Sequence, residues 1–321
     1  MRKGSAKHAF LAARMGAFLQ AGSPMDPLTF GPVRIHLGDK SGKYPDGNQV
    51  VVQGADTRVA FDTPLVAERI GAELDDVDMV ILGHVHEDHM VALGRLARAQ
   101  VQVHEADLAA AQSWAGLARH YGYPPPVLAR VREMIERDFG YQPRPDATGY
   151  ADGAAWDLGG GVRVRAHHLP GHTAGHCALV VESEGVAFIG DIDLTGFGPY
   201  YGDATSDLAQ FERSLERVKD IDAKVWVTSH HRGVITERAA FLQALEQFRH
   251  KIDERGDRLL GWLRERPHTL DQLVARRLLY PVGVELPYVD SAERRSIGLH
   301  LVQLQARGAV RAVGGDGYVA A

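Results

Sequence analysis

The sequence predicts a layered α/β protein, and three observations support this fold class. Short apolar segments separated by Gly, Asp and Pro turns fill residues 33–63, as in the hairpins of a sheet. Further along, apolar segments of strand length alternate with segments of helical period. Several strand-like segments end in His or Asp. These features together predict a sheet-based core with chemically active side chains at the ends of its strands.

The first part of the chain alternates strands with helices. The expected strands are 33–37, 49–53, 58–61, 79–82 and 101–104. The expected helices among them are 65–74 and 92–99. This alternation is typical of a sheet with helices packed on its face.

Residues from about 106 to 150 have a different character and predict a helical insertion over the sheet. Helical stretches at 108–121 and 127–139 lie on either side of a run of three prolines. Aromatic side chains accompany them, namely Trp114, Tyr121, Tyr123, Phe139 and Tyr141. Two interpretations stay open for these aromatics: the wall of a binding pocket, or simple packing between helices.

Strands return after the insertion, and the chain then ends in a segment of another kind. The later strands are expected at 162–166, 177–181, 186–189 and 224–227. Helices are expected at 252–265, 270–278 with Thr269 as N-cap, and 292–306, followed by a β-hairpin over 309–320. Three helices and a hairpin predict a winged-helix-like domain at 251–321 and place the main domain at 25–250.

Composition narrows the class of protein. An apolar content of 45% over 321 residues supplies a full core. The net charge of -5 argues against electrostatic capture by nucleic acid or by an anionic membrane, so a small-molecule partner is expected. No stretch approaches the roughly 20 apolar residues that span a bilayer. The single cysteine, Cys177, forms no internal disulfide, which favours a cytoplasmic location and leaves His, Asp and Glu as metal ligands.

The first 24 residues have no clear signal-peptide pattern. Their apolar run is broken by Arg14 and lacks a cleavage site. We expect residues 1–24 to be a leader or an expression remnant, with Met25 as a candidate native start.

The densest chemical signal is the segment His84-Val85-His86-Glu87-Asp88-His89, directly after the apolar run 79–82. It places five potential metal ligands in six residues at the end of a strand. Imidazole nitrogens and carboxylate oxygens suit Zn²⁺ and neighbouring first-row ions. A solvated polar loop without metal is the alternative, and it leaves three imidazoles unexplained.

Three later segments repeat this arrangement of a strand followed by a ligand-type side chain. They are Gly171-His172-Thr173-Ala174-Gly175-His176, then Gly190-Asp191, and then Ser229-His230-His231. In this order, the four segments resemble the metallo-β-lactamase superfamily, whose signature is HxHxDH, a GHTxGH-type element, a Gly-Asp pair and a late histidine. The resemblance covers about residues 33–235. The chain departs from the pattern at Met90-Val91-Ala92, where the family commonly has x-Gly-Gly.

The resemblance implies a four-layer αββα sandwich with a dinuclear metal site at one edge of two facing sheets. Carried over to this sequence, it assigns His84, His86 and His172 to the first metal and Asp88, His89 and the late histidine to the second, with Asp191 as the bridge and Glu87 pointing away. For the late ligand we favour His231, because a glycine and an apolar pair follow it closely. His230 is the alternative. Asp62 resembles the strand-end Asp that supports a ligand, and His176 resembles a structural histidine.

Two divalent ions, with Zn²⁺ favoured over Fe or Mn, suit hydrolysis. Ions roughly 3.5–4 Å apart share a bridging hydroxide and polarise the attacked oxygen. Asp88 is expected to orient the hydroxide and return a proton to the leaving group. Tyr200, in the Gly/Pro/aromatic loop after Asp191, is a candidate hydrogen-bond donor to an oxyanion, with Tyr201 as a rival. Loop anchoring is the alternative role for this aromatic pair.

The leading function is therefore a dinuclear metal-dependent hydrolase of a small ester-like substrate: a thioester, a lactone or a phosphoester. An endoribonuclease or phosphodiesterase is the first rival, although eleven Lys and Arg against nine Asp and Glu after His250 make a weak phosphate-binding surface. A β-lactamase is a second rival. A metal-sensing DNA-binding regulator is a third, with Arg294 and Arg295 on its candidate recognition helix. Burial of that helix within the fold or in a homodimer is the simpler explanation of its apolar residues.

Overall fold

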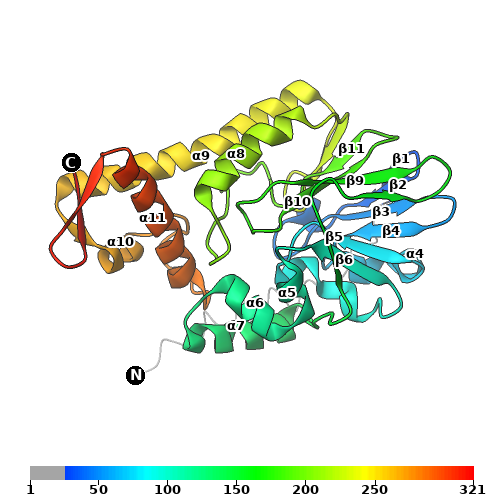
Figure 1. Cartoon of the computed structure of the whole chain (residues 1–321), viewed down its shortest axis with the longest axis horizontal. Coiled ribbons are helices and arrows are strands. Elements are labelled where there is room, and N and C mark those ends of the chain that lie inside the picture. Colours follow the sequence, from blue (N-terminus) through cyan, green and yellow to red (C-terminus); the bar gives the residue numbers. More distant parts are fainter. Residues whose placement is uncertain (1–25) are drawn as a thin grey trace.

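The computed structural model describes residues 26–321, and two β-sheets packed face to face form its centre (Figure 1). The expectation for residues 1–24 lies outside the described residues. Among residues 26–321, no helix combines the length and the apolar character that crossing a membrane requires.

The first sheet has seven strands in sequence order. They are β1 (Leu28–Phe30), β2 (Val33–His36), β3 (Gln49–Gln53), β4 (Arg58–Phe61), β5 (Met79–Leu82), β6 (Gln100–His104) and β7 (Thr148–Tyr150). The strands β1 to β4 pair antiparallel, as hairpins do. The strands β4 to β7 pair parallel, because a helix or a helical insertion connects each to the next.

The second sheet has six strands. Their order is β13 (Val234–Ile235), β12 (Val225–Val227), β11 (Val186–Phe188), β10 (Cys177–Val181), β9 (Arg163–His168) and β8 (Ala155–Asp157). All neighbours pair antiparallel except β11 and β12. The predicted strands of both sheets are thus found within one or two residues of their expected bounds.

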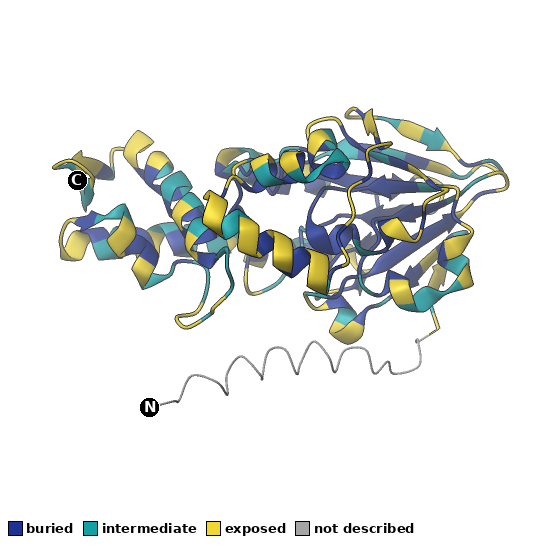
Figure 2. Ribbon diagram, turned by 90° about the horizontal axis from the view of Figure 1, so that it is seen from below, coloured by how far each residue is buried: buried dark blue, intermediate teal, exposed yellow. Residues whose placement is uncertain are grey.

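Alternation along the strands produces the layers. In β3, Val50 and Val52 point into the core between the sheets, while Val51 points to the outer face. In β10, Leu179 points inward and Val180 outward. Because both faces of each sheet are apolar, each sheet is covered on its outer side by helices, and the central strands are buried (Figure 2). The described chain therefore has the predicted αββα layering.

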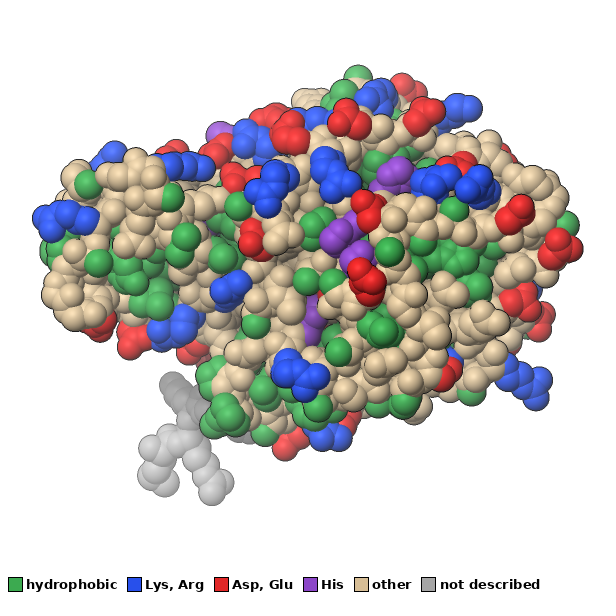
Figure 3. All heavy atoms as spheres, viewed as in Figure 1, with side chains coloured by type: hydrophobic (Ala, Val, Ile, Leu, Met, Phe, Trp, Pro, Cys, Tyr) green, Lys and Arg blue, Asp and Glu red, His purple; other side chains and the backbone are tan. Residues whose placement is uncertain are grey.

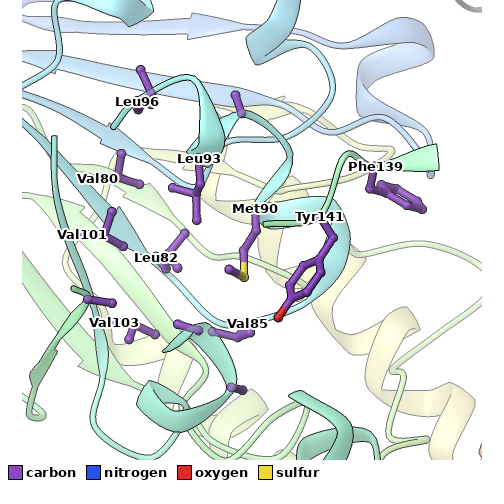
Figure 4. Packing of buried hydrophobic residues seen from close by; sticks show 14 of the residues in the cluster. Val80, Leu82, Val85, Met90, Leu93, Leu96, Val101, Val103, Phe139 and Tyr141 are labelled. Atoms are coloured by element: carbon purple, nitrogen blue, oxygen red, sulfur yellow. The ribbon is translucent and has the colours of Figure 1, made fainter. Parts of the chain in front are cut away.

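Helices α5 (Leu108–Gln112), α6 (Trp114–Tyr121) and α7 (Pro125–Asp138) belong to the insertion and pack on the first sheet. Figure 4 shows part of this core, where Met90 lies between Leu82 and Tyr141. Helix α8 (Leu208–Arg217), the short turn η3 (Val218–Asp220) and the first half of α9 (Arg238–Glu265) cover the second sheet.

Three predicted helices are shorter or divided in the structure. The stretch expected at 108–121 consists of α5 and α6, separated at Ser113, whose backbone is extended. The helix expected at 65–74 is split into α3 (Ala67–Ile70) and α4 (Ala72–Asp75) at Gly71, whose φ of 74° no right-handed helix allows. The helix expected at 92–99 is a 3₁₀ turn, η2 (Val91–Gly94), which follows η1 (Glu87–His89). A short helical turn, α2 (Asp39–Gly42), lies between β2 and β3.

The last part of the chain forms a separate small core. Its elements are the second half of α9, β14 (His268–Thr269), α10 (Leu270–Arg276), α11 (Val289–Ala306), β15 (Val310–Val313) and β16 (Gly317–Ala320). Thr269 caps α10, as the sequence predicts, and Gln272 completes a capping box with it. The helix predicted from 252 begins at Arg238, so the expected boundary at 250/251 falls inside one continuous helix that links both cores (Figure 1).

Candidate metal centre

The four ligand-bearing segments meet at one end of the two sheets. The first is the turn η1 and the residues before it, directly after β5; the others precede β10 or follow β11 and β12. Figure 3 shows histidine and acidic side chains gathered in the middle of one face of the molecule. Segments separated by up to about half the chain thus supply a single site.

The first group consists of His84, His86, His172 and Asp191, each with one ligand atom within 4.8 Å of the others. The His86 Nδ1 atom lies 3.1 Å from His172 Nε2, which lies 3.3 Å from Asp191 Oδ2. The three histidines are buried. The structure therefore brings together every residue that the sequence assigns to the first metal.

The second group consists of Asp88, His89 and His230. The His230 Nε2 atom lies 3.1 Å from Asp88 Oδ2, and His89 Nε2 lies 3.2 Å from Asp191 Oδ1. Asp191 therefore directs one carboxylate oxygen at each group. This is the arrangement expected of a carboxylate that bridges two ions.

The donor atoms of both groups fit metal ions. The buried atoms His84 Nδ1, His84 Nε2, His89 Nε2, His230 Nε2 and Asp191 Oδ1 have no hydrogen-bond partner. An unsatisfied buried polar atom is costly, and five of them in one place are unusual for a fold. Imidazole nitrogens and carboxylate oxygens are ligands of divalent first-row metals, and such ions would satisfy one nitrogen of His84 and the atoms of the other three residues.

The protonation states of two central groups also suit metal binding. Burial, followed by the charge of His89, lowers the pKa of His84 well below its ordinary value, so its imidazole is neutral. Burial alone would raise the pKa of Asp191, but the charges of His89 and His230 outweigh it and lower that pKa well below the usual range. His84 and Asp191 are thus in the forms that bind metals, whereas neighbouring carboxylates raise the pKa of His86, His89 and His230, each of which would release a proton on binding an ion.

The preference for His231 as the late ligand is corrected by the structure, which brings His230 to the second group. The backbone carbonyl of Asp46 lies 2.7 Å from His230 Nδ1 and leaves Nε2 directed at Asp88. His231 has a φ of 61°, is half-buried and belongs to neither group, although it lines the adjoining cavity.

Three oxygen atoms orient the histidines from behind. Asp62 Oδ2 lies 2.8 Å from His89 Nδ1, as the sequence predicts for a supporting carboxylate. Asp203 Oδ2 lies 2.7 Å from His86 Nε2, and the His172 Nδ1 atom lies 3.0 Å from a backbone carbonyl, that of Tyr200. Sequence reasoning missed Asp203, whose only local signal is its place in the Gly/Pro/aromatic loop.

Two further buried side chains fix the loops that carry the ligands. Asp107 accepts hydrogen bonds from the Thr173 hydroxyl at 2.7 Å and the Gly175 amide at 2.9 Å. His176 Nε2 accepts the amide of Asp191 at 3.1 Å, which confirms its structural role. Gly190 is required there, because with its φ of 57° a Cβ atom would lie 2.5 Å from His176 Nε2. Asp107 was not predicted from the sequence.

A cavity of about 360 Å³ opens beside both groups. Its walls are rich in tyrosine: Tyr44, Tyr121, Tyr123, Tyr200, Tyr280 and Tyr288. The insertion thus supplies pocket-wall residues, Tyr121 and Tyr123, while its other aromatics, Trp114, Phe139 and Tyr141, pack in the core without lining the cavity. Glu87 points away from both groups, into this wall, where it accepts the Tyr121 hydroxyl at 2.6 Å.

Asp193 is another cavity residue that the sequence did not single out. Its Oδ1 atom accepts the backbone N–H of His230 at 3.1 Å. Burial and then the charge of Asp191 raise the pKa of this carboxyl to about 7. Asp193 therefore orients the peptide that carries the late histidine.

This fold and this site define a class of protein. The model of the metallo-beta-lactamase superfamily matches residues 54–230, which is more than half of the chain. The chain belongs to the metallo-β-lactamase superfamily.

Among curated proteins, the chain is similar to an atrochrysone carboxyl ACP thioesterase from Pseudocercospora fijiensis, with 26% identity over 208 residues, 60% of this chain and 59% of that protein. A thioesterase of the same name from Passalora fulva is 28% identical over 166 residues, 47% of each chain. The chain spans less than two thirds of the length of either relative.

Two solved structures share the fold over most of the chain. A metallo-beta-lactamase family protein from Thermus thermophilus is 26% identical with a TM-score of 0.66, and the match covers 86% of this chain and 94% of that one. A beta-lactamase domain protein from Burkholderia ambifaria is 20% identical with a TM-score of 0.68, covering 94% and 95%.

Proposed function

We propose that the protein is a dinuclear metal-dependent hydrolase of thioesters. The observation that carries this proposal is the position of Asp191, whose Oδ2 faces the first group of ligands at 3.3 Å from His172 Nε2 while Oδ1 faces the second at 3.2 Å from His89 Nε2. A carboxylate whose two oxygens face different groups of ligands is suited to binding two neighbouring cations. Zn²⁺ is the ion we expect, because five of the seven ligand residues are histidines.

Bound ions would supply an activated water molecule at neutral pH and would polarise the substrate carbonyl. His84, His86, His172 and Asp191 would hold one ion, and Asp88, His89, His230 and Asp191 the other. The protein's own contribution is to fix these donors before substrate arrives. Supporting contacts from Asp62 and Asp203 hold the imidazole rings in position.

Asp88 is the side chain we assign to proton transfer. It lines the cavity and belongs to the second group, with His230 3.1 Å from its Oδ2 atom. A carboxylate in this position accepts the proton of the attacking water and returns it to the leaving group. In a thioester this leaving group is a thiolate, which departs without needing the strong protonation that an amine requires.

Tyr200 is the side chain we assign to the developing oxyanion. Its ring centroid lies 6.3 Å from that of His86, and its hydroxyl lies in the cavity wall, 3.2 Å from the Tyr123 hydroxyl. Burial, reinforced by the charge of Asp203, raises the pKa of Tyr200 well above its ordinary value. The phenol is therefore protonated at neutral pH and can donate a hydrogen bond.

The thioester is favoured over the other esters for two reasons. The curated relatives are named as ACP thioesterases. The cavity wall combines tyrosine rings with several carboxylates, and Lys43 is the one Lys or Arg that lines it among residues 26–321. A phosphodiester would meet negative charge with little compensation, so a neutral acyl group is the better ligand.

A DNA-binding role for the last domain has little support in the contacts of α11. Arg295 donates to the backbone carbonyls of Asp203, Ala204 and Ser206 at 2.7 to 3.2 Å, and Arg294 pairs with Asp271. Both arginines are thus occupied within the protein.

A substrate screen tests the proposed function. Metal-loaded protein is assayed with acyl thioesters, a lactone, a phosphodiester and a chromogenic β-lactam, and released thiol or acid is measured. We expect thioester hydrolysis that falls at least about 1000-fold in His84→Ala and is unchanged in His250→Ala, whose side chain is 59% exposed on α9. Activity retained in His84→Ala, or found only with the phosphodiester, would contradict the proposal.

A further inference from the structure

We propose that the loop joining α10 to α11, residues 277–288, selects for substrates with an aromatic acyl group. This inference rests on the proposed thioester hydrolysis and names the part of the substrate that the cavity holds. The loop contributes Tyr280, Leu286 and Tyr288 to the cavity beside the metal ligands. The C-terminal segment therefore completes the substrate pocket of the catalytic domain.

The loop side chains continue an aromatic surface that the catalytic domain begins. The Tyr288 ring is nearly parallel to that of Tyr123, with centroids 6.3 Å apart and planes inclined by 11°. Tyr123 in turn stacks with Tyr121 at 5.4 Å. On the other side, Tyr280 contacts Phe197 with centroids 5.7 Å apart. Separate segments of the chain thus combine their rings in one wall.

Hydroxyl groups of this wall are largely engaged with protein carboxylates. The Tyr121 hydroxyl donates to Glu87 at 2.6 Å, and the Tyr123 hydroxyl donates to Asp203 at 2.5 Å. These contacts leave for a ligand the ring surfaces that line the cavity. Ring faces and edges favour another aromatic group, through contacts worth about 0.5–1.5 kcal/mol beyond the buried area.

The composition of the wall distinguishes an aromatic acyl group from an alkyl chain. Among the described residues that line the cavity, the aliphatic ones are Val131 and Leu286, against seven Tyr and Phe rings. A pocket for a flexible alkyl chain is normally lined by aliphatic side chains. The volume of about 360 Å³ lies in the usual range for small-ligand sites and has room for an acyl group of one or two rings.

The first part of the loop, up to Tyr280, is fixed before any ligand binds. Glu293, buried on α11, accepts the backbone amides of Leu278 at 2.8 Å, Leu279 at 3.0 Å and Tyr280 at 2.8 Å. Leu278 is itself buried in the C-terminal core. A wall held in this way loses little conformational entropy on binding, which increases its selectivity.

The test compares two N-acetylcysteamine thioesters, one with a 2-naphthoyl group and one with an acetyl group, in wild type and loop variants. We expect the ratio of kcat/KM for naphthoyl over acetyl to fall about tenfold in Tyr288→Leu and Tyr280→Leu, because each loses one ring contact. Tyr288→Phe keeps the ring and should keep the ratio. Val282→Ala is the matched control, since Val282 is in the same loop, 81% exposed and outside the cavity wall.

A binding measurement separates this inference from the proposed function. Calorimetry with the non-hydrolysable 2-naphthylmethyl thioether of N-acetylcysteamine needs no catalysis, and melting temperatures show that each variant is folded. Binding that weakens in Tyr288→Leu but not in Val282→Ala supports the aromatic pocket even if no thioester is hydrolysed. Equal ratios in all variants, together with no binding of the thioether to wild type, would overturn the inference while leaving hydrolysis of the acetyl thioester intact.

Discussion

The Oδ2 atom of Asp203 lies 2.7 Å from Nε2 of His86, on the side of the ring opposite the nitrogen that faces His172. Burial alone would lower the pKa of His86, but the hydrogen bond and the charge of Asp203 raise it to about 9. The carboxylate therefore holds the Nε2 proton of the imidazole, and the Nδ1 proton is the one that a bound metal would replace. Tyr123 donates a second hydrogen bond to the same carboxylate.

Replacing Asp203 by Asn should weaken metal binding by about 10- to 100-fold, because the amide holds the His86 ring without increasing its basicity. Competition with a chromophoric chelator measures this affinity. The control is Asp220→Asn, at an exposed position outside the site. Equal affinities in the two variants would show that Asp203 does not position the ligand.

The neighbouring histidines 230 and 231 should differ sharply in their effect on metal content. His230→Ala removes a member of the second group and should reduce the bound metal from two equivalents toward one, while His231→Ala should keep both. Elemental analysis after gel filtration measures the content. A loss in His231→Ala of the same size as in His230→Ala would reject the assignment of the late ligand.

Local sequence patterns were sufficient for the sheets. The segment 49–53 was predicted as a strand from its run of β-branched residues, and β3 has those bounds. The pattern was less informative at 65–74, where the apolar spacing continues across Gly71 although the helix is interrupted there. It was also insufficient at 250/251, because the apolar period of α9 passes from one core to the next without a break. A local pattern indicates which face of a helix or strand is buried. Which part of the protein packs against that face depends on the tertiary fold.

The same distinction applies to the site. His84, His86 and His172 were predicted because each lies in a dense local motif, and the structure brings them together. The contact between His86 and Asp203 joins positions 117 residues apart, and no local pattern marks the aspartate. The choice between His230 and His231 depends on the local backbone conformation, with a φ of 61° at His231. Sequence periodicity does not determine this conformation.

Arg255 anchors the loop that contributes Tyr200, and its loss should destabilise the protein. The buried guanidinium donates to the carbonyls of Pro199 and Phe197, each at 2.5 Å, and to the Tyr201 hydroxyl at 2.9 Å. Arg255→Met leaves these acceptors unsatisfied and should lower the free energy of unfolding by about 3 kcal/mol.

Urea unfolding measures the stability loss in Arg255→Met, with Arg213→Met on the exposed face of α8 as the control. Because the Tyr200 carbonyl lies 3.0 Å from His172 Nδ1, metal affinity should fall as well. A variant as stable as the control would show that the loop does not depend on this side chain.

His300 should make the protein less stable as the pH falls. Burial, followed by the charges of Arg255 and Arg307, lowers the pKa of His300 to about 3. The unfolded chain binds this proton near its ordinary pKa of 6.5, and the folded chain does not, so stability is lost as the pH decreases from 6.5 toward 3. The loss from this one group is at most about 1.4 kcal/mol per pH unit.

The variant His300→Gln removes this titration and can still pair with the Tyr201 hydroxyl, which lies 2.9 Å from the imidazole in the native protein. We expect the free energy of unfolding to fall less steeply between about pH 6.5 and pH 4.5 in the variant than in wild type, by the equivalent of about one proton. Urea titrations at several pH values measure both slopes, with His250→Gln as the control for losing an exposed histidine. Parallel slopes in wild type and His300→Gln would mean that His300 takes up its proton equally in the folded and the unfolded protein.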